Sequence, residues 1–129
     1  MEVLHTDQAP QAIGPYSQAI WADGFLFASG QIPIDPTTGS LVEGDITAQT
    51  RQVAKNIQAV LAAAGMDFSN VVKTSCFLAD MGDFQAFNEE YAKWFVSRPA
   101  RSCVAVKPFR KTRRWKWKSL PGKAGGEIR

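Results

Sequence analysis

Arg101 is the residue of this sequence whose setting points most directly to chemistry. It starts a short run at residues 101–106 in which small and apolar residues predominate, and this pattern predicts a strand. No Asp or Glu lies within eight residues on either side of it. A guanidinium is seldom buried without an anionic partner, so this one pairs either with a distant carboxylate of the chain or with an external anion. At the start of a strand, the planar group is suited to hold a ligand carboxylate through two parallel hydrogen bonds.

Three strands are expected in the N-terminal part of the chain, before any helix. They are residues 2–4, 16–21 and 25–31. The dipeptide Asp23-Gly24 predicts a tight hairpin between the second and the third, since both residue types tolerate the left-handed conformation that such turns need. Residues 32–44 contain several turn-forming Pro and Gly residues and are expected to form a loop.

Two amphipathic helices are expected, each followed by a strand. Asp45 is a suitable N-cap for a helix that ends before Gly65, and a second helix runs from Phe84 to about Ser97. The strands that follow them are residues 71–79 and 101–106. The order β-β-β-α-β-α-β predicts an α+β fold in which both helices lie on one face of the sheet.

The composition is typical of one soluble domain. Apolar residues make up 45% of the 129 residues and charged residues 21%, and no apolar run is long enough for a membrane span or a signal peptide. Cys76 and Cys103 lie inside apolar, β-like runs, which favours buried thiols over a disulfide and a reducing, cytoplasmic location. A single histidine, His5, and the lack of a Cys/His cluster argue against a zinc site.

The positive charge is concentrated near the C-terminus. Residues 110–129 hold eight of the 15 Lys and Arg residues but one of the 12 Asp and Glu residues, so the formal net charge of +3 conceals an acidic body. Between residues 110 and 122 the tail also lacks the apolar alternation of a strand. The sequence therefore predicts a single domain at residues 1–109 and an atypical basic tail at residues 110–129.

Four stretches of the body carry motifs at related spacings. They are residues 12–18 (AIGPYSQ), 27–33 (FASGQIP), 48–56 (AQTRQVAKN) and 99–106 (PARSCVAV). Together they resemble the RidA (formerly YjgF) family of reactive-intermediate deaminases, from about residue 5 to Phe109. The resemblance implies a chorismate-mutase-like βαβ fold that assembles into a trimeric barrel with a cleft at each subunit interface. It also implies hydrolysis of enamines and imines, such as 2-aminoacrylate, 2-iminopropanoate and 2-iminobutanoate, to 2-keto acids and ammonia, without a metal or organic cofactor.

The resemblance further implies roles for individual residues. Arg101 would clamp the substrate carboxylate, and Tyr16 would place its hydroxyl in the cleft to orient substrate or water. Ser29 and Gly30 would line the site, where a glycine lets the ligand lie against bare main chain. Cys103 would line the pocket beside the reacting carbon, so the implied site gathers residues from three of the four stretches.

Cys103 is two residues along from Arg101 and so shares its face of the strand, while Asn88 would form a polar wall of the site. Each of these residues also has an ordinary structural interpretation. Tyr16 by itself would be an aromatic residue at a rim, Cys103 a core residue and Asn88 an amide on a helix surface. Arg101 as the carboxylate clamp is the role on which residue chemistry and resemblance agree.

The tail departs from the family pattern at a position that matters for catalysis. The family's last strand supplies a glutamate fifteen residues after the clamp arginine, and this chain has Lys116 there. The codons for Trp115 to Lys118 must read TGG-AAR-TGG-AAR, and a shift of one base turns them into a frame with two forced glutamates, the first at position 116. The sequence therefore predicts that the family's last strand is lost after Phe109, through the loss of one base near Arg110.

Two other functions fit parts of the sequence. Without its glutamate, the same fold would be a non-catalytic, regulatory module that binds small carboxylates. The Lys and Arg residues interleaved with Trp115 and Trp117 could also contact RNA phosphates and stack on bases, as in an RNA-binding protein or endoribonuclease. Binding to nucleic acid is not favoured, because the basic tail is attributed to a shifted reading frame and residues 1–109 are net acidic. The expected partners are small 2-imino and 2-amino-unsaturated carboxylates and further copies of the chain in a homotrimer, with no membrane.

Overall fold

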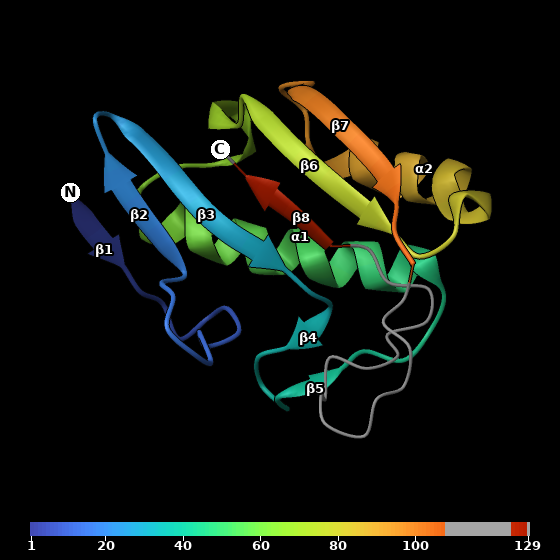
Figure 1. The fold of residues 1–129 in the computed structure, drawn as a ribbon, viewed down its shortest axis with the longest axis horizontal. Coiled ribbons are helices and arrows are strands. Elements are labelled where there is room, and N and C mark those ends of the chain that lie inside the picture. Colours follow the sequence, from blue (N-terminus) through green and yellow to red (C-terminus); the bar gives the residue numbers. More distant parts are fainter. Residues whose placement is uncertain (108–124, 129) are drawn as a thin grey trace.

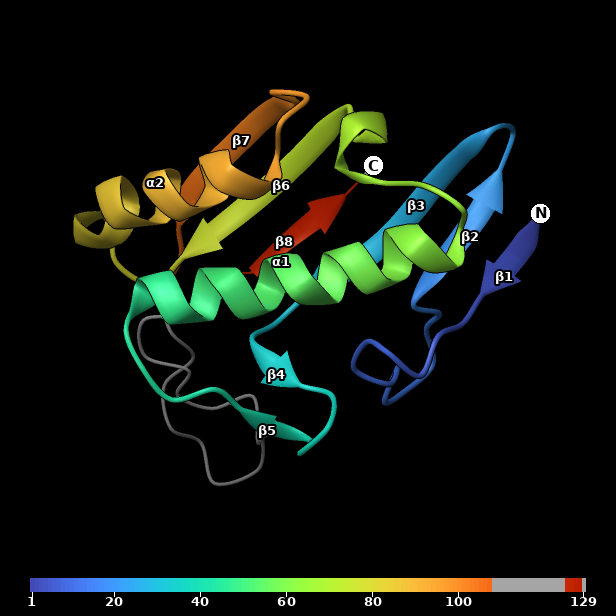
Figure 2. The same cartoon turned by 180° about the vertical axis from the view of Figure 1, so that it is seen from behind.

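A computed structural model of the chain describes residues 1–107 and 125–128. Its main sheet has six strands in the order β1-β2-β3-β8-β6-β7. They are β1 (Glu2–Leu4), β2 (Ala19–Ala22), β3 (Phe25–Gln31), β6 (Lys73–Leu78), β7 (Ala100–Ala105) and β8 (Gly125–Ile128). Strands β6 and β7 are parallel, and the other neighbours are antiparallel. Helices α1 (Ile46–Ala63) and α2 (Phe84–Trp94) cover the same face of the sheet (Figures 1 and 2), so the predicted α+β layering is confirmed.

The predicted hairpin at Asp23-Gly24 joins β2 to β3. Asp23 has φ 51° and Gly24 has φ 80°, the left-handed pair that a two-residue turn between twisted strands needs. The register on either side of the turn pairs Ala22 with Phe25. Strand β2 begins later than predicted because the chain is still turning at Tyr16, whose backbone N–H bonds to the carbonyl of Gly14 at 2.9 Å.

The prediction of a plain loop at residues 32–44 is wrong. This segment contains a small separate hairpin of β4 (Ile34–Asp35) and β5 (Ser40–Leu41). The Asp35 carboxylate fixes its turn by accepting the N–H and the hydroxyl of Thr37, at 2.8 and 2.6 Å. Two-residue strands are too short to show any periodicity in the sequence, which is why the Pro and Gly content suggested a loop.

Helix α1 begins and ends where its capping residues predict. The side chain of Asp45 accepts the backbone N–H of Ala48 at 3.0 Å, and Gly65 follows the helix with φ 71°. Its apolar stripe forms much of the core, with Val60 and Leu61 almost fully buried. Helix α2 ends at Trp94, slightly before the predicted end. In the part of the chain that the structure describes, no helix is long and apolar enough to cross a membrane.

Strand β8 corrects the expectation that the sheet loses its last strand. Residues Gly125–Ile128 lie between β3 and β6 and pair antiparallel with both, with Ile128 opposite Ala28 on one side and Thr74 on the other. The N–H and C=O groups on the facing edges of β3 and β6 need hydrogen-bond partners in the middle of the sheet. Any extended segment can supply these partners, because the ladder bonds use only main-chain atoms. The predicted boundary at Phe109 and the substituted position Lys116 lie outside the described residues.

The face of the sheet opposite the helices carries exposed apolar side chains. Phe25 is 57% exposed, while Phe27 and Val104 are each 47% exposed. The alternate residues of β3 and β6, such as Leu26 and Leu78, are buried towards the helices, as the period of two requires. The bare face is therefore an apolar surface without a covering layer among the described elements (Figures 1 and 2).

Candidate functional site

Arg101 is the second residue of β7, and its side chain lies against α2. Its Nη1 donates a hydrogen bond to Oδ1 of Asn88 at 2.7 Å. Within residues 1–107, where side chains are described, Arg101 forms no salt bridge. The distant carboxylate that the sequence left open as a partner is therefore absent from this part of the chain.

Three aromatic rings of α2 surround the guanidinium of Arg101. Its Cζ lies 4.8 Å from the ring centroid of Tyr91, 5.5 Å from that of Phe84 and 5.9 Å from that of Phe87. Rings at these distances attract a cation through their negative faces. The three aromatic residues and Asn88 share one stripe of the helix because they are spaced three or four residues apart.

A shallow groove of about 590 Å³ has Arg101, Asn88 and Tyr91 on its wall. The guanidinium is therefore partly open to the groove, while the aromatic rings of α2 keep water from the rest of it. Such a cation binds a planar anion more firmly than a fully hydrated one does. The arrangement is suited to hold a small carboxylate.

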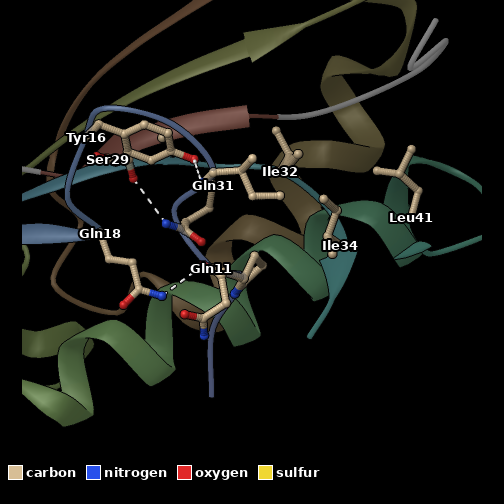
Figure 3. Close-up of a pocket in the computed structure, with 11 residues that line it drawn as sticks. Gln11, Tyr16, Gln18, Ser29, Gln31, Ile32, Ile34 and Leu41 are labelled. Atoms are coloured by element: carbon tan, nitrogen blue, oxygen red, sulfur yellow. Dashed lines mark hydrogen bonds between the residues drawn. The ribbon is translucent and has the colours of Figure 1, made fainter. Parts of the chain in front are cut away.

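Tyr16, Ser29 and Gly30 line a second hollow of about 330 Å³ (Figure 3). The hydroxyl of Tyr16 accepts the backbone N–H of Ile13 at 3.3 Å, which leaves its own proton free to donate. Ser29 donates its hydroxyl to the carbonyl of Ser17 at 2.6 Å. The rest of the wall is largely apolar, and its apolar members are Pro10, Ile13, Ile32, Ile34 and Leu41. The hollow therefore offers a hydroxyl and bare main chain beside an apolar wall.

Buried glutamine amides hold the chain that forms this second hollow. The side chain of Gln18 donates to the carbonyls of Pro10 and Thr6, at 2.8 and 3.0 Å, and accepts the backbone N–H of Thr6 at 2.7 Å. Gln31 donates to the carbonyl of Ser29 at 3.2 Å (Figure 3). The Gln18 bonds tie residues 6–10 to the segment that leads into β2, and Ser29 of β3 donates its backbone N–H to the carbonyl of Gln18 at 3.0 Å, which holds that segment beside β3.

The predicted site residues therefore fall into two groups on one chain. Arg101 and Asn88 line the groove at α2, whereas Tyr16, Ser29 and Gly30 line the hollow beside β3. No residue is common to the walls of these two depressions. A single chain brings together the members of each group but does not join the two.

Cys103 lies two residues after Arg101 on β7, directly opposite Cys76 of β6. Both thiols are free. Burial raises the pKa of Cys76 to about 11 and also raises the pKa of Cys103, so both thiols are protonated at neutral pH. Cys103 packs against the core and is absent from the walls of both depressions, so its place beside the reacting carbon stays a prediction.

The aromatic rings around Arg101 are the feature of the site that sequence reasoning missed. The helical spacing of Phe84, Phe87 and Tyr91 is typical of the amphipathic helix predicted from Phe84, and the sequence separately indicates that Arg101 lacks a nearby acid. The aromatic spacing on the helix and the arginine without a nearby acid, taken together, indicate a cation–π site. Among residues 1–107, no three His, Cys, Asp or Glu side chains gather in a way that could hold a metal ion.

Comparison with known proteins decides the family. The model of the family described as endoribonuclease L-PSP, also called YjgF/RidA, matches residues 6–115. The chain belongs to this family. The resemblance predicted from its four motifs is thus confirmed, and all six candidate residues lie within the matched range.

Two relatives and one solved structure in the YjgF/RidA family illustrate the similarity. A RutC family protein of Pyrococcus horikoshii is 57% identical over 106 residues, covering 81% of this chain and 84% of that protein. The human 2-iminobutanoate/2-iminopropanoate deaminase is 49% identical over 105 residues, covering 81% of this chain and 77% of that protein. The crystal structure of the Rid family protein YyfA from Yersinia pestis superposes with a TM-score of 0.86 at 46% identity, covering 98% of this chain and 95% of that one.

Proposed function

We propose that this protein hydrolyses small 2-imino and 2-enamino carboxylates to 2-keto acids and ammonia. One observation carries the proposal. Arg101 is a partly buried cation with an amide and three aromatic rings around it and no acidic partner among residues 1–107. Such a group is suited to hold an anion from outside, and a family relative at 49% identity is named 2-iminobutanoate/2-iminopropanoate deaminase.

The chemistry that these residues support is simple. An enamine first takes up a proton at carbon to become the iminium, and water then adds to the C=N carbon. The resulting carbinolamine loses ammonia to leave the 2-keto acid. Arg101 would hold the carboxylate and fix the reacting carbon, while the Tyr16 hydroxyl, which can still donate its proton, would orient the water or the departing nitrogen. Because the iminium is already electrophilic, much of the acceleration would come from positioning.

The complete site in this proposal lies between copies of the chain in a homotrimer. The two groups of candidate residues line separate depressions, so a neighbouring copy would have to bring Arg101 of one chain to Tyr16 of the next. The bare apolar face of the sheet, with Phe25, Phe27 and Val104 exposed, supports association because water contact with such a surface is unfavourable. A closed ring of identical subunits would cover all these faces at once.

The test is an imine-hydrolysis assay. A pyridoxal-phosphate threonine dehydratase supplies 2-iminobutanoate continuously, and semicarbazide traps the imine that has not yet been hydrolysed. We expect the protein to suppress semicarbazone formation, and Arg101→Met to lose at least about 100-fold of this activity because the carboxylate is no longer held. Lys55→Met, which removes an exposed cation from α1, is the matched control and retains activity. A protein that adds nothing to spontaneous hydrolysis contradicts the proposal.

A non-catalytic carboxylate-binding module is the second candidate. It is favoured by Lys116, which stands where the family supplies its glutamate. In this case the protein binds 2-oxobutanoate in calorimetry but does not accelerate imine hydrolysis. The two measurements together separate the candidates.

A further inference from the structure

Thr74, Tyr91 and Arg101 form a connected set that links the sheet to α2. Thr74 on β6 and Arg101 on β7 are direct partners in the parallel register. A hydrogen bond of 2.7 Å joins the hydroxyl oxygen of Tyr91 to that of Thr74. The ring of Tyr91 also lies nearest to the guanidinium, at 4.8 Å. The residue beside Arg101 in the sheet therefore anchors the ring that contacts Arg101.

The ring of Tyr91 is held firmly by its other neighbours. It stacks on Phe95 with centroids 4.1 Å apart and an interplanar angle of 14°, and it lies 5.5 Å from Phe87. All three aromatic residues are buried, and so is Thr74. The ring cannot swing away from the arginine without disturbing this packing, so its position is set before any ligand arrives.

The fixed ring of Tyr91 limits the freedom of the Arg101 side chain before a ligand binds. An arginine side chain loses much rotamer freedom when it binds a ligand, and that loss weakens binding. Here Asn88 holds Nη1 while the ring of Tyr91 holds the planar group, so part of the loss is already incurred in the free protein. Within the described residues no hydrogen bond engages Nε or Nη2, and these atoms remain available to a carboxylate.

We infer that Tyr91, anchored by Thr74, is a positioning residue that preorganises Arg101 to bind the carboxylate of the substrate. The inference rests on the proposed role of Arg101 as the carboxylate clamp. It assigns a binding function to a buried tyrosine that would otherwise be a core residue. The phenol has no proton-transfer role here, and its effect passes entirely through the arginine.

Calorimetric binding of 2-oxobutanoate and the split between KM and kcat for 2-iminobutanoate test this inference. Tyr91→Leu removes ring and hydroxyl, and we expect it to weaken 2-oxobutanoate binding about 10-fold, with KM raised equally and kcat within about 2-fold of the wild type. Tyr91→Phe and Thr74→Val each remove one end of the hydrogen bond and weaken binding about 3-fold. The double variant weakens it no further, because both changes remove the same bond. Thr74→Ser keeps a hydroxyl and restores wild-type affinity.

Phe68→Leu is the matched control. Phe68 is a buried aromatic residue that packs on Trp94 and Phe95 and makes no cation–π contact with Arg101. It should lower Tm while leaving 2-oxobutanoate affinity unchanged. If Tyr91→Leu behaves in the same way, Tyr91 is only a core residue and the inference is overturned. If Tyr91→Leu does not fold, the milder Tyr91→Phe, Thr74→Val and Thr74→Ser set decides the matter.

The binding readout separates this inference from the proposed enzymatic activity. A wild-type protein that binds 2-oxobutanoate without hydrolysing imines overturns the deaminase proposal but leaves the role of Tyr91 open to confirmation by affinity. A wild-type protein that hydrolyses 2-iminobutanoate, with a KM that Tyr91→Leu leaves unchanged, overturns the role of Tyr91 and leaves the deaminase proposal standing.

Discussion

The guanidinium of Arg101 donates a hydrogen bond of 2.7 Å to the side-chain carbonyl of Asn88. A neutral amide at this place fixes the arginine without neutralising it, so the positive charge stays available to an anion. An aspartate at the same position would supply the anion from within the chain. The identity of this one helix residue thus decides whether the arginine can serve a ligand.

We therefore predict that Asn88→Asp weakens binding of 2-oxobutanoate by about 10-fold or more, because the new carboxylate competes for Arg101. Calorimetry at increasing salt measures the effect, and the loss should shrink as salt screens the new pair. Gln85→Glu adds the same charge to an exposed position of α2 and should leave affinity nearly unchanged. Equal losses in the two variants would mean that general charge, and not the bond to Arg101, is responsible.

Subunit mixing tests the shared site. If Arg101 of one chain works with Tyr16 of another, inactive Arg101→Met and Tyr16→Phe proteins should recover activity when unfolded together and refolded. Random assembly from equal amounts leaves about a quarter of the sites with both native residues, so about a quarter of wild-type activity should return. Each variant refolded alone is the control. Absence of recovery from well-formed mixed oligomers contradicts a site that is shared between copies.

Glu90 is predicted to hold the two helices together in a pH-dependent way. Its buried carboxylate accepts hydrogen bonds from Arg51 of α1 and from Lys93 and Trp94 of α2. Burial acts to raise the pKa of Glu90, but the hydrogen bonds from Trp94, Lys93 and Arg51 outweigh it and hold that pKa below its usual value. The carboxylate therefore stabilises the fold fully above its unfolded-state pKa, and this stabilisation is lost as the pH falls through the lower, folded-state value.

Glu90→Gln should consequently lower the free energy of unfolding at about pH 7 by about 1.5 kcal/mol, since the partly exposed Arg51 and Lys93 lose the buried carboxylate that accepts their hydrogen bonds. Urea unfolding over a pH series measures this, and the variant should lose less stability than the wild type on acidification. Glu89→Gln, at the exposed neighbouring position, is the control and should change little. Parallel pH profiles for wild type and Glu90→Gln would show that another group governs the acid response.

The basic tail yields a prediction about the gene. We propose that residues 110–129 are read one base out of phase with the family's last strand, as the forced glutamates in the neighbouring frame suggest. Resequencing across the codons for Phe109 and Arg110, together with mass spectrometry of the native protein, tests this. The expected native peptide contains Glu-x-Glu in place of Trp115 to Lys118. A native peptide that contains both tryptophans contradicts the proposal and strengthens the carboxylate-binding module.

Locally encoded features were predictable from the sequence. The hairpin at Asp23-Gly24 and the ends of α1 at Asp45 and Gly65 depend on the conformations of a few neighbouring residues, and the structure has them as predicted. The hairpin of β4 and β5 was missed because its strands are too short for a pattern. Strand β8 was missed because Gly125–Ile128 has no alternation, and its place in the sheet is created by β3 and β6.

The site was predictable residue by residue but not as an arrangement. Arg101 attracted notice because no acid lies near it in sequence, and Asn88 because of the family resemblance. The link between Tyr91 and Thr74 required the parallel pairing of β6 with β7 and the packing of α2 across both. Such contacts join segments that are distant in sequence, and no local pattern encodes them.

The position of β8 has a consequence for how the chain folds. Strands β3 and β6 are joined in the sheet through β8, which comes from the end of the described chain. Until that segment is synthesised, the β1-β2-β3 hairpins and the β6-α2-β7 unit are two half-sheets connected through α1. Pairing across such a long sequence separation forms slowly, and unpaired strand edges bind other chains. We expect the nascent protein to depend on chaperones until Gly125–Ile128 has emerged from the ribosome and can close the sheet.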